Sequence, residues 1–155
     1  MLTRRSQVIA GVLLLMIVTI EIGGVFMTQI SNGNVATTDF QASFWRAGHG
    51  HAGVLVILSL VALLLADGAR VAWGAVGWLA RLAIPVGGVL MSTGFFLSAL
   101  EDGATGPNGF VVILGLGGVS LAVGVVTLAV TLLVPSLQLP AGDRSAAHTS
   151  DARAS

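Results

Sequence analysis

The sequence predicts an all-α, polytopic membrane protein: a bundle of four transmembrane helices that run up, down, up and down. Hydrophobic residues make up 55% of the 155 residues and charged residues only 9%, whereas a soluble domain carries roughly 25% charged residues. The apolar residues gather in four stretches, each near the roughly 20 residues that cross a bilayer core. Because the backbone in lipid must satisfy its own hydrogen bonds, these stretches are expected to be helices.

The four predicted helices span about residues 8–30, 48–66, 82–100 and 110–134. The first is expected to be retained rather than cleaved, because its apolar run exceeds the roughly 7–15 residues of a signal-peptide core and contains Glu21. The segment from Asp67 to Ala80 is either a connector or the start of one long third helix. Residues 135–155, rich in Ala, Ser, Asp and Arg, are expected to form a disordered cytoplasmic tail.

The basic residues predict the orientation in the membrane. All seven are arginine, which we interpret as the coding bias of a GC-rich bacterial genome. With the amino terminus inside, the outer side holds only Arg46. The cytoplasmic side holds the other six: Arg4, Arg5, Arg70, Arg81, Arg144 and Arg153. Positive charge favours the cytoplasmic side, so both termini are expected inside, and the bacterial plasma membrane is the expected location.

Composition also excludes several kinds of function. The net charge is zero and no basic stripe or phosphate-binding loop occurs, so nothing indicates nucleic-acid binding. The absence of cysteine excludes disulfides, thiolate metal sites and thiol catalysis. No set of nucleophile, base and orienting residue is visible, so enzyme activity is the class with the least support.

Small residues are expected to hold the helices together, because helices in lipid associate through close backbone approach and a few polar contacts. They recur at spacings of three and four in the fourth predicted helix and are frequent in the third. We expect tight packing rather than ligand binding from this set: Gly117, Ser120, Gly124, Thr127, Gly87 and Gly94.

A polar site is expected in the outer half of the bundle. Glu21 lies inside the first helix, where an acidic group costs about 2.5–3.5 kcal/mol on insertion scales. His49 and His51 are two residues apart, which in a regular helix turns them about 200° from each other. We therefore expect His51 to face Glu21, and His49 to lie at the rim unless this segment is extended. A protonated Glu21 that only bonds a neighbouring helix is the structural alternative.

Several ligands suit such a site. His51, Glu21 and His49 are the candidate metal ligands, since a catalytic zinc site needs three protein ligands. Haem or another transition metal is left open, although a haem with two histidine ligands would need a dimer. A small-molecule pocket needs only a cleft with one or two polar groups. Four charged residues are expected at the outer rim: Arg46, Asp39, Glu101 and Asp102.

Two segments carry a resemblance to known proteins. Phe44–Leu55 (FWRAGHGHAGVL) and Ser92–Ser98 (STGFFLS), the latter followed by the turn at Pro107–Asn108, resemble segments of a group of small four-helix membrane proteins of high-GC bacteria. The resemblance implies a fold and a location only. The His-x-His-Ala-Gly part is also similar to the helix-start histidine motif of haem–copper oxidase-like membrane proteins. There the second histidine is a haem ligand, which implies that role for His51.

The sequence thus predicts a multi-pass bacterial membrane protein with a polar intramembrane site that binds a metal, haem or small ligand, or relays protons. One alternative is a non-catalytic accessory or assembly subunit of a membrane complex, in which the same residues only hold helices together. The other is an oligomeric channel or transporter, whose pathway would form between subunits. The lipid bilayer is the expected partner, with a second copy or another membrane protein left open.

Overall fold

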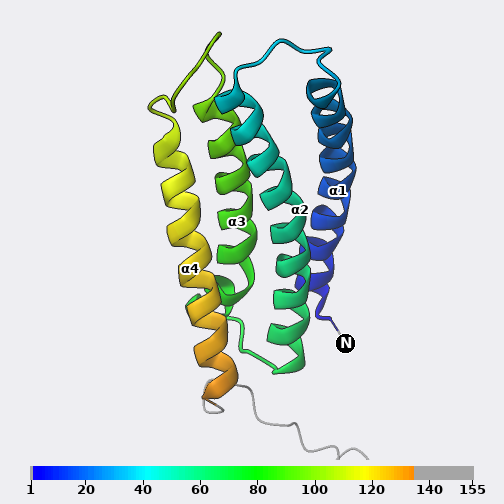
Figure 1. Ribbon diagram of the computed structural model, residues 1–155. Coiled ribbons are helices and arrows are strands. Elements are labelled where there is room, and N and C mark those ends of the chain that lie inside the picture. Colours follow the sequence, from blue (N-terminus) through cyan, green and yellow to red (C-terminus); the bar gives the residue numbers. More distant parts are fainter. Residues whose placement is uncertain (1, 135–155) are drawn as a thin grey trace, which may run out of the picture.

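The computed structural model describes residues 2–134 and contains four α-helices in that range: α1 (Arg4–Ser31), α2 (Asp39–Gly68), α3 (Ala75–Ser98) and α4 (Val111–Leu133) (Figure 1). Each helix is long and apolar enough to cross a membrane. The all-helical class and the four spanning-length helices are therefore as predicted. The predicted tail at 135–155 lies outside the described residues.

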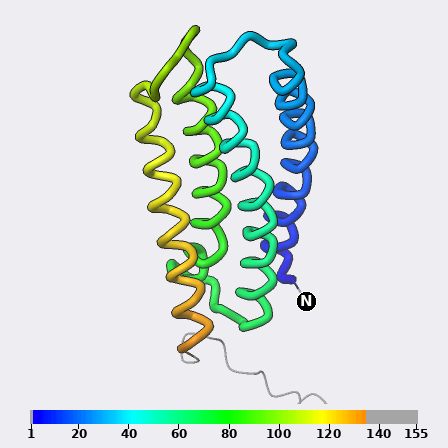
Figure 2. Tube along the Cα trace, viewed as in Figure 1, coloured from blue at the N-terminus to red at the C-terminus, as the bar shows by residue number. Residues whose placement is uncertain are grey.

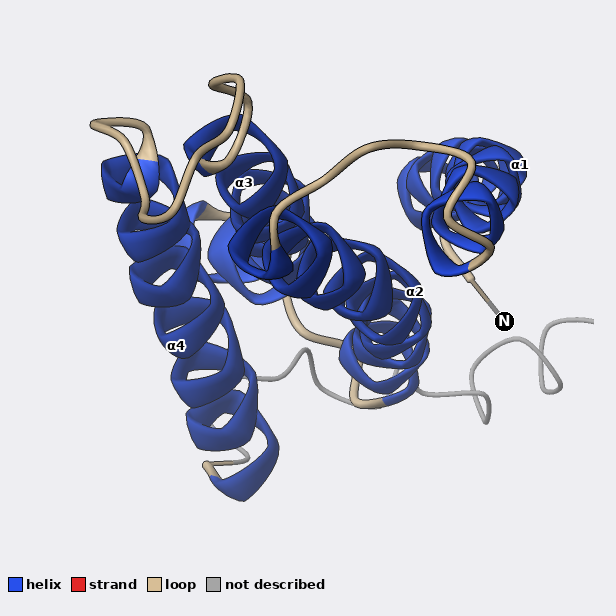
Figure 3. Ribbon diagram, turned by 45° about the horizontal axis from the view of Figure 1, so that its top comes forward, coloured by secondary structure: helices blue, strands red, loops and turns tan. Residues whose placement is uncertain are grey.

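The helices lie side by side in chain order, so that α1 is at one edge and α4 at the other (Figures 1 and 3). The connections at 32–38 and 99–110 meet at one end, and the connection at 69–74 lies at the other end with the start of α1 (Figure 2). Hydrogen bonds connect neighbouring segments at both ends of the molecule. At the first end Gln41 Nε2 donates to Ala99 O and Glu101 O, and at the second Thr3 N donates to Asp67 Oδ2.

The second helix begins nine residues earlier than the expected start at residue 48. Its first turn is closed by a capping box, in which the Thr38 hydroxyl accepts from Gln41 N while the Gln41 side chain accepts from Thr38 N. This box satisfies two of the backbone donors that a helix start leaves free. The expected bounds of 48–66 were based on apolar residues alone, and α2 extends beyond this apolar stretch at both ends. The histidines at 49 and 51 therefore lie in regular helix, and the extended geometry considered for them does not occur.

The ambiguous segment Asp67–Ala80 is divided between two helices. α2 continues to Gly68, a short connection follows, and α3 begins at Ala75. Arg81 is buried at this end of the molecule, with only 1% of its surface exposed, and its guanidinium forms an ion pair of 2.8 Å with Asp67. It also donates to Gly77 O and Val71 O, and lies 4.2 Å from the Trp73 ring.

Glycines bring α3 and α4 into close backbone contact. A Cβ added to Gly94 would lie 2.5 Å from Leu114 N, and one added to Gly117 would lie 2.5 Å from Met91 N. A Cβ on Gly87 would lie 2.7 Å from Leu121 N, and one on Gly124 would lie 2.8 Å from Ile84 N. Ser120 Oγ donates to Ala83 O across the same interface. This is the most extensive helix pair of the protein, because only side chains without bulk allow two backbones to approach so closely.

The first helix packs mainly on α2. Two apolar clusters join the pair, one around Leu13, Val56 and Leu63 and the other around Met27, Ile30 and Ala42. Most of α1 stays exposed, and its spanning segment is the least buried of the four. Figure 3 shows α1 set apart from α3, with α2 beside both. The space between α1 and α3 is where the candidate site lies.

Candidate functional site

The His49 side chain points from α2 towards α1. Its ring lies over two glycines of α1: a Cβ on Gly23 would be 3.4 Å from His49 Nδ1, and one on Gly24 would be 3.5 Å from His49 Cε1. Glycine at both positions leaves room for the imidazole between the helices. Among the described residues no hydrogen bond is formed by either ring nitrogen of His49. An imidazole always offers a donor, an acceptor or both, so His49 has unused hydrogen-bonding capacity.

His49 lines a pocket of about 250 Å³ between α1, α2 and α3. Thr19 and Gly23 form part of its α1 side, and Ser92 and Phe96 form part of its α3 side. Apart from His49, Thr19, Ser92 and Thr93, the lining residues are apolar or glycine, and none carries a full charge. A mostly apolar cleft with a few polar groups that converge is the usual form of a small-molecule site.

Ser92 provides the strongest anomaly in this pocket. Its Oγ is buried and is the one buried side-chain nitrogen or oxygen in residues 2–134 that lacks a hydrogen-bond partner. Two other buried helix serines behave differently, since Ser59 Oγ donates to Leu55 O and Ser98 Oγ donates to Gly94 O, both at 2.6 Å. Leaving a buried hydroxyl unpaired costs about 1–3 kcal/mol. Ser92 is one of the residues that line the pocket, and a ligand oxygen that bonded its hydroxyl would recover that free energy.

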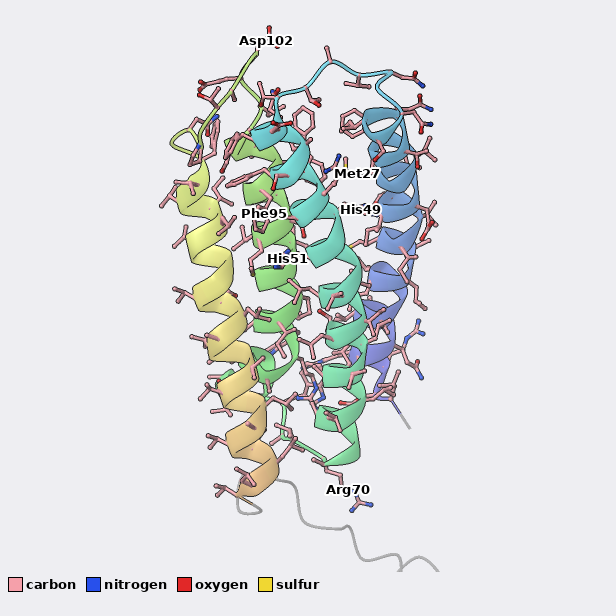
Figure 4. All side chains as sticks on the ribbon, in the orientation of Figure 1. Met27, His49, His51, Arg70, Phe95 and Asp102 are labelled. Carbon is pink, nitrogen blue, oxygen red and sulfur yellow. The ribbon has the colours of Figure 1, made fainter. Side chains whose placement is uncertain are left out.

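The His51 side chain points to the other side of α2, as Figure 4 shows. Its ring stacks on Phe95 of α3 with centroids 5.0 Å apart, and its Nδ1 lies 2.7 Å from Ala47 O. A carbonyl oxygen only accepts hydrogen bonds, so Nδ1 carries a proton and donates. His51 also lines a shallow, apolar surface hollow with Ala47, Gly50 and Val54. His51 is thus held by its own helix and by α3, away from α1.

Glu21 lies on the exposed side of α1. It is two residues before Gly23, which contacts His49, and two positions in a helix are about 200° apart. The expected meeting of Glu21 with His51 therefore does not form: the first faces outwards from α1 and the second lies beyond α2. No hydrogen bond or ion pair of Glu21 occurs in the described part of the chain.

The candidate metal ligands are likewise not brought together. Within residues 2–134 no group of three or more His, Cys, Asp or Glu side chains is placed to hold a metal ion. The rim residues Arg46, Asp39, Glu101 and Asp102 are all exposed. The ion pair of the described residues joins Arg81 to Asp67, so the rim charges do not pair with one another.

Comparisons with known proteins add no relative. No family model matches the chain, and neither the curated proteins nor the solved structures contain a match. The class of protein is therefore defined by the fold and the pocket alone. It is an all-helical protein with four helices able to span a membrane and a small polar pocket between three of them.

Sequence reasoning missed two of the residues that matter here. Ser92 was read only as part of a resemblance, and Arg81 only as a positive charge at the inner side. The sequence carried no clear signal for Ser92, because the expected helix bounds placed His49 at the start of the second helix and Ser92 well inside the third. The pairing of Arg81 with Asp67 had a weak signal, since both lie next to a short connection between two apolar runs.

Proposed function

We propose that this chain is a multi-pass protein of the bacterial plasma membrane, with both termini cytoplasmic, and that it binds a small lipid-soluble ligand at His49. The observation that carries the proposal is the pocket between α1, α2 and α3, which is lined both by His49, whose imidazole forms no hydrogen bond within the described residues, and by Ser92, whose hydroxyl forms none. Two polar groups without partners in apolar surroundings favour a ligand that supplies hydrogen-bonding atoms. The ligand enters as a binding partner, and no catalytic step is assigned.

The proposed site uses His49, whereas the site predicted from the sequence is centred on His51. His49 has a pocket, two free ring nitrogens and a second polar group nearby, whereas His51 is bonded to Ala47 O and stacked on Phe95. Metal binding by one chain has less support, because within residues 2–134 no group of three or more potential ligand side chains is placed to hold a metal ion. The geometry gives no support to a proton relay through Glu21 and His51, because the two side chains do not meet.

The decisive experiment measures lipophilic molecules that remain bound on purification. The protein is purified in detergent, extracted with organic solvent, and the molecules recovered per mole of protein are quantified by mass spectrometry. We expect one species in near-stoichiometric amount from the wild type and at least a tenfold loss with His49→Leu. His51→Leu is the matched control, because it removes an imidazole two residues away that faces another side, and it should retain the species. Equal recovery from all three proteins would refute the proposal.

A second function is favoured by Glu21. A carboxyl exposed on the membrane face of α1 is unfavourable in lipid by about 2.5–3.5 kcal/mol on insertion scales, and a polar group of another membrane protein would offset this. That observation supports the accessory-subunit interpretation. Affinity purification of the tagged chain from its native membrane would then yield one stoichiometric partner that is lost with Glu21→Gln. Retention of that partner by the Gln variant would argue against this role for Glu21.

A further inference from the structure

The pocket at His49 continues into a second hollow. This hollow lies between α1 and α3, has a volume of about 390 Å³, and is lined by apolar side chains alone. Met16 of α1 and Val89 of α3 line both spaces, so the two are adjoining. From the first pocket the second extends towards the ends of α1 and α3 that lie near Val8 and Leu82. We call the two together the α1–α3 groove.

The lining of the groove restricts what it accepts. His49 follows Asp39, the first residue of α2, by ten residues, which is about 15 Å along the helix axis at 1.5 Å per residue. No arginine, lysine, aspartate or glutamate lines the groove. A phosphate or carboxylate head would therefore be buried without a counter-charge, which is strongly unfavourable.

We infer that the ligand is a neutral lipophile with a compact head that carries a hydrogen-bonding oxygen and a long apolar tail. This inference rests on the proposed function and deepens it. The head oxygen accepts from Ser92 Oγ and from a ring nitrogen of His49, while the tail lies in the apolar part of the groove along Val12 and Val86. The groove is partly open at its surface, so the ligand enters from the bilayer. Two kinds of molecule share this chemistry, a tailed quinone and a long-chain alcohol.

The first experiment tests the tail with a pair of probes. Dimethoxy-methyl-benzoquinone without a tail and the same head with a ten-carbon tail are titrated against the protein in lipid nanodiscs, and partition into empty nanodiscs is subtracted. We expect the tailed probe to bind at least tenfold more tightly. Val89→Trp fills the junction of the two spaces and should remove that advantage. Val119→Trp is the matched control, because Val119 is exposed on α4 away from the groove.

The outcomes separate the inference from the proposed function. If Val89→Trp leaves the tail advantage intact while His49→Leu abolishes binding of both probes, the groove is not the tail site and the inference fails, but the proposed function survives. If His49→Leu changes neither probe, the proposed function fails and the head placement with it. Titration of 1-decanol beside the tailed quinone distinguishes the two sources, because the probe that binds more tightly identifies the kind of head; binding of neither above the empty-nanodisc background would overturn the inference.

The second experiment locates the tail directly. The tailed quinone carries a diazirine at the end of the chain, is photoactivated in the nanodiscs, and the labelled residues are identified by mass spectrometry. Labelling concentrated at residues 8–16 of α1 and 82–90 of α3 supports the inference. Labelling spread evenly over the exposed faces, including that of α4 around Val119, would mean ordinary lipid contact and would overturn it.

Discussion

At the scale of single residues, three of the helix serines, at positions 59, 92 and 98, differ in what their hydroxyl groups do. Two of them donate to the carbonyl four residues earlier, and Ser92 does not. A buried donor without a partner lowers stability, so its presence at a pocket indicates a role in binding. Residues that serve a site commonly reduce the stability of the fold.

We therefore expect Ser92→Ala to weaken ligand binding without loss of stability. The free energy of unfolding should stay within about 0.5 kcal/mol of wild type or rise by about 1 kcal/mol, because an unpaired hydroxyl is removed. Ser98→Ala is the control and should lower it by about 1 kcal/mol, because a formed hydrogen bond is lost. Thermal or denaturant unfolding in detergent measures both. A larger loss for Ser92→Ala than for Ser98→Ala would contradict this assignment.

The ion pair of Arg81 and Asp67 serves structure rather than binding. Both side chains are almost fully buried, with 1% and 2% of their surfaces exposed, and the guanidinium donates to Asp67 Oδ1 from Nε and Nη2. Thr3 N donates to the other carboxylate oxygen, Oδ2. This cluster joins the start of α1, the end of α2 and the first turns of α3. The polar groups satisfy one another, as burial requires.

Asp67→Ala should destabilise the protein by about 3–5 kcal/mol, because it leaves the Arg81 charge buried without its partner. Asp102→Ala, in an exposed turn, should change stability by no more than about 0.5 kcal/mol. The melting temperatures of the two variants in the same detergent provide the comparison. Similar melting temperatures would show that the ion pair contributes little.

At the scale of helices, the α3–α4 pair depends on glycine at particular positions and not on glycine content. Gly117 would place a Cβ 2.5 Å from Met91 N, whereas a Cβ on Gly115 or Gly118 of the same helix meets nothing within 4 Å. Gly117→Ala should therefore separate the helices and destabilise the protein by about 1–3 kcal/mol. Gly115→Ala and Gly118→Ala should be neutral or stabilise it by up to about 1 kcal/mol, because alanine favours helix over glycine. Unfolding of the three variants side by side decides the point; equal effects would reject the close contact.

The helices themselves were largely predictable from the sequence, and the directions of their side chains were not. Length and apolarity are sums over many residues, so four spanning segments were evident. The side that each histidine faces depends on where α2 lies relative to its neighbours, and α2 is apolar on nearly all sides. The 200° separation of His49 and His51 was predicted from helical geometry, but His51 was expected to face α1 and the structure places His49 there. Gly23 and Gly24 now provide the reason, since they leave space for His49 alone.

At the scale of the whole molecule, the arrangement in chain order explains why a groove exists at all. α2 has neighbours on two sides, whereas α1 is held mainly by α2 and by the contacts of Thr3 at one end. The side of α1 that faces α3 is therefore left open, and the His49 pocket lies in this space. A closed four-helix bundle, in which α1 also met α4, would bury the pocket and deny it direct access from lipid. The open edge and the polar pocket thus belong to one arrangement.

The orientation of this arrangement in the membrane can be tested cleanly, because the chain has no cysteine. Single cysteines at Ala36 and Thr105 probe the end that we propose to face outwards, and Gly68→Cys probes the end near Arg4, Arg5 and Arg70; all three positions are exposed. Because arginine favours the cytoplasmic side, a membrane-impermeant maleimide added to intact cells should label Ala36→Cys and Thr105→Cys but not Gly68→Cys. Permeabilised cells are the control and should label all three. Labelling of Gly68→Cys alone in intact cells would reverse the orientation, and would place the His49 pocket nearer the cytoplasmic side.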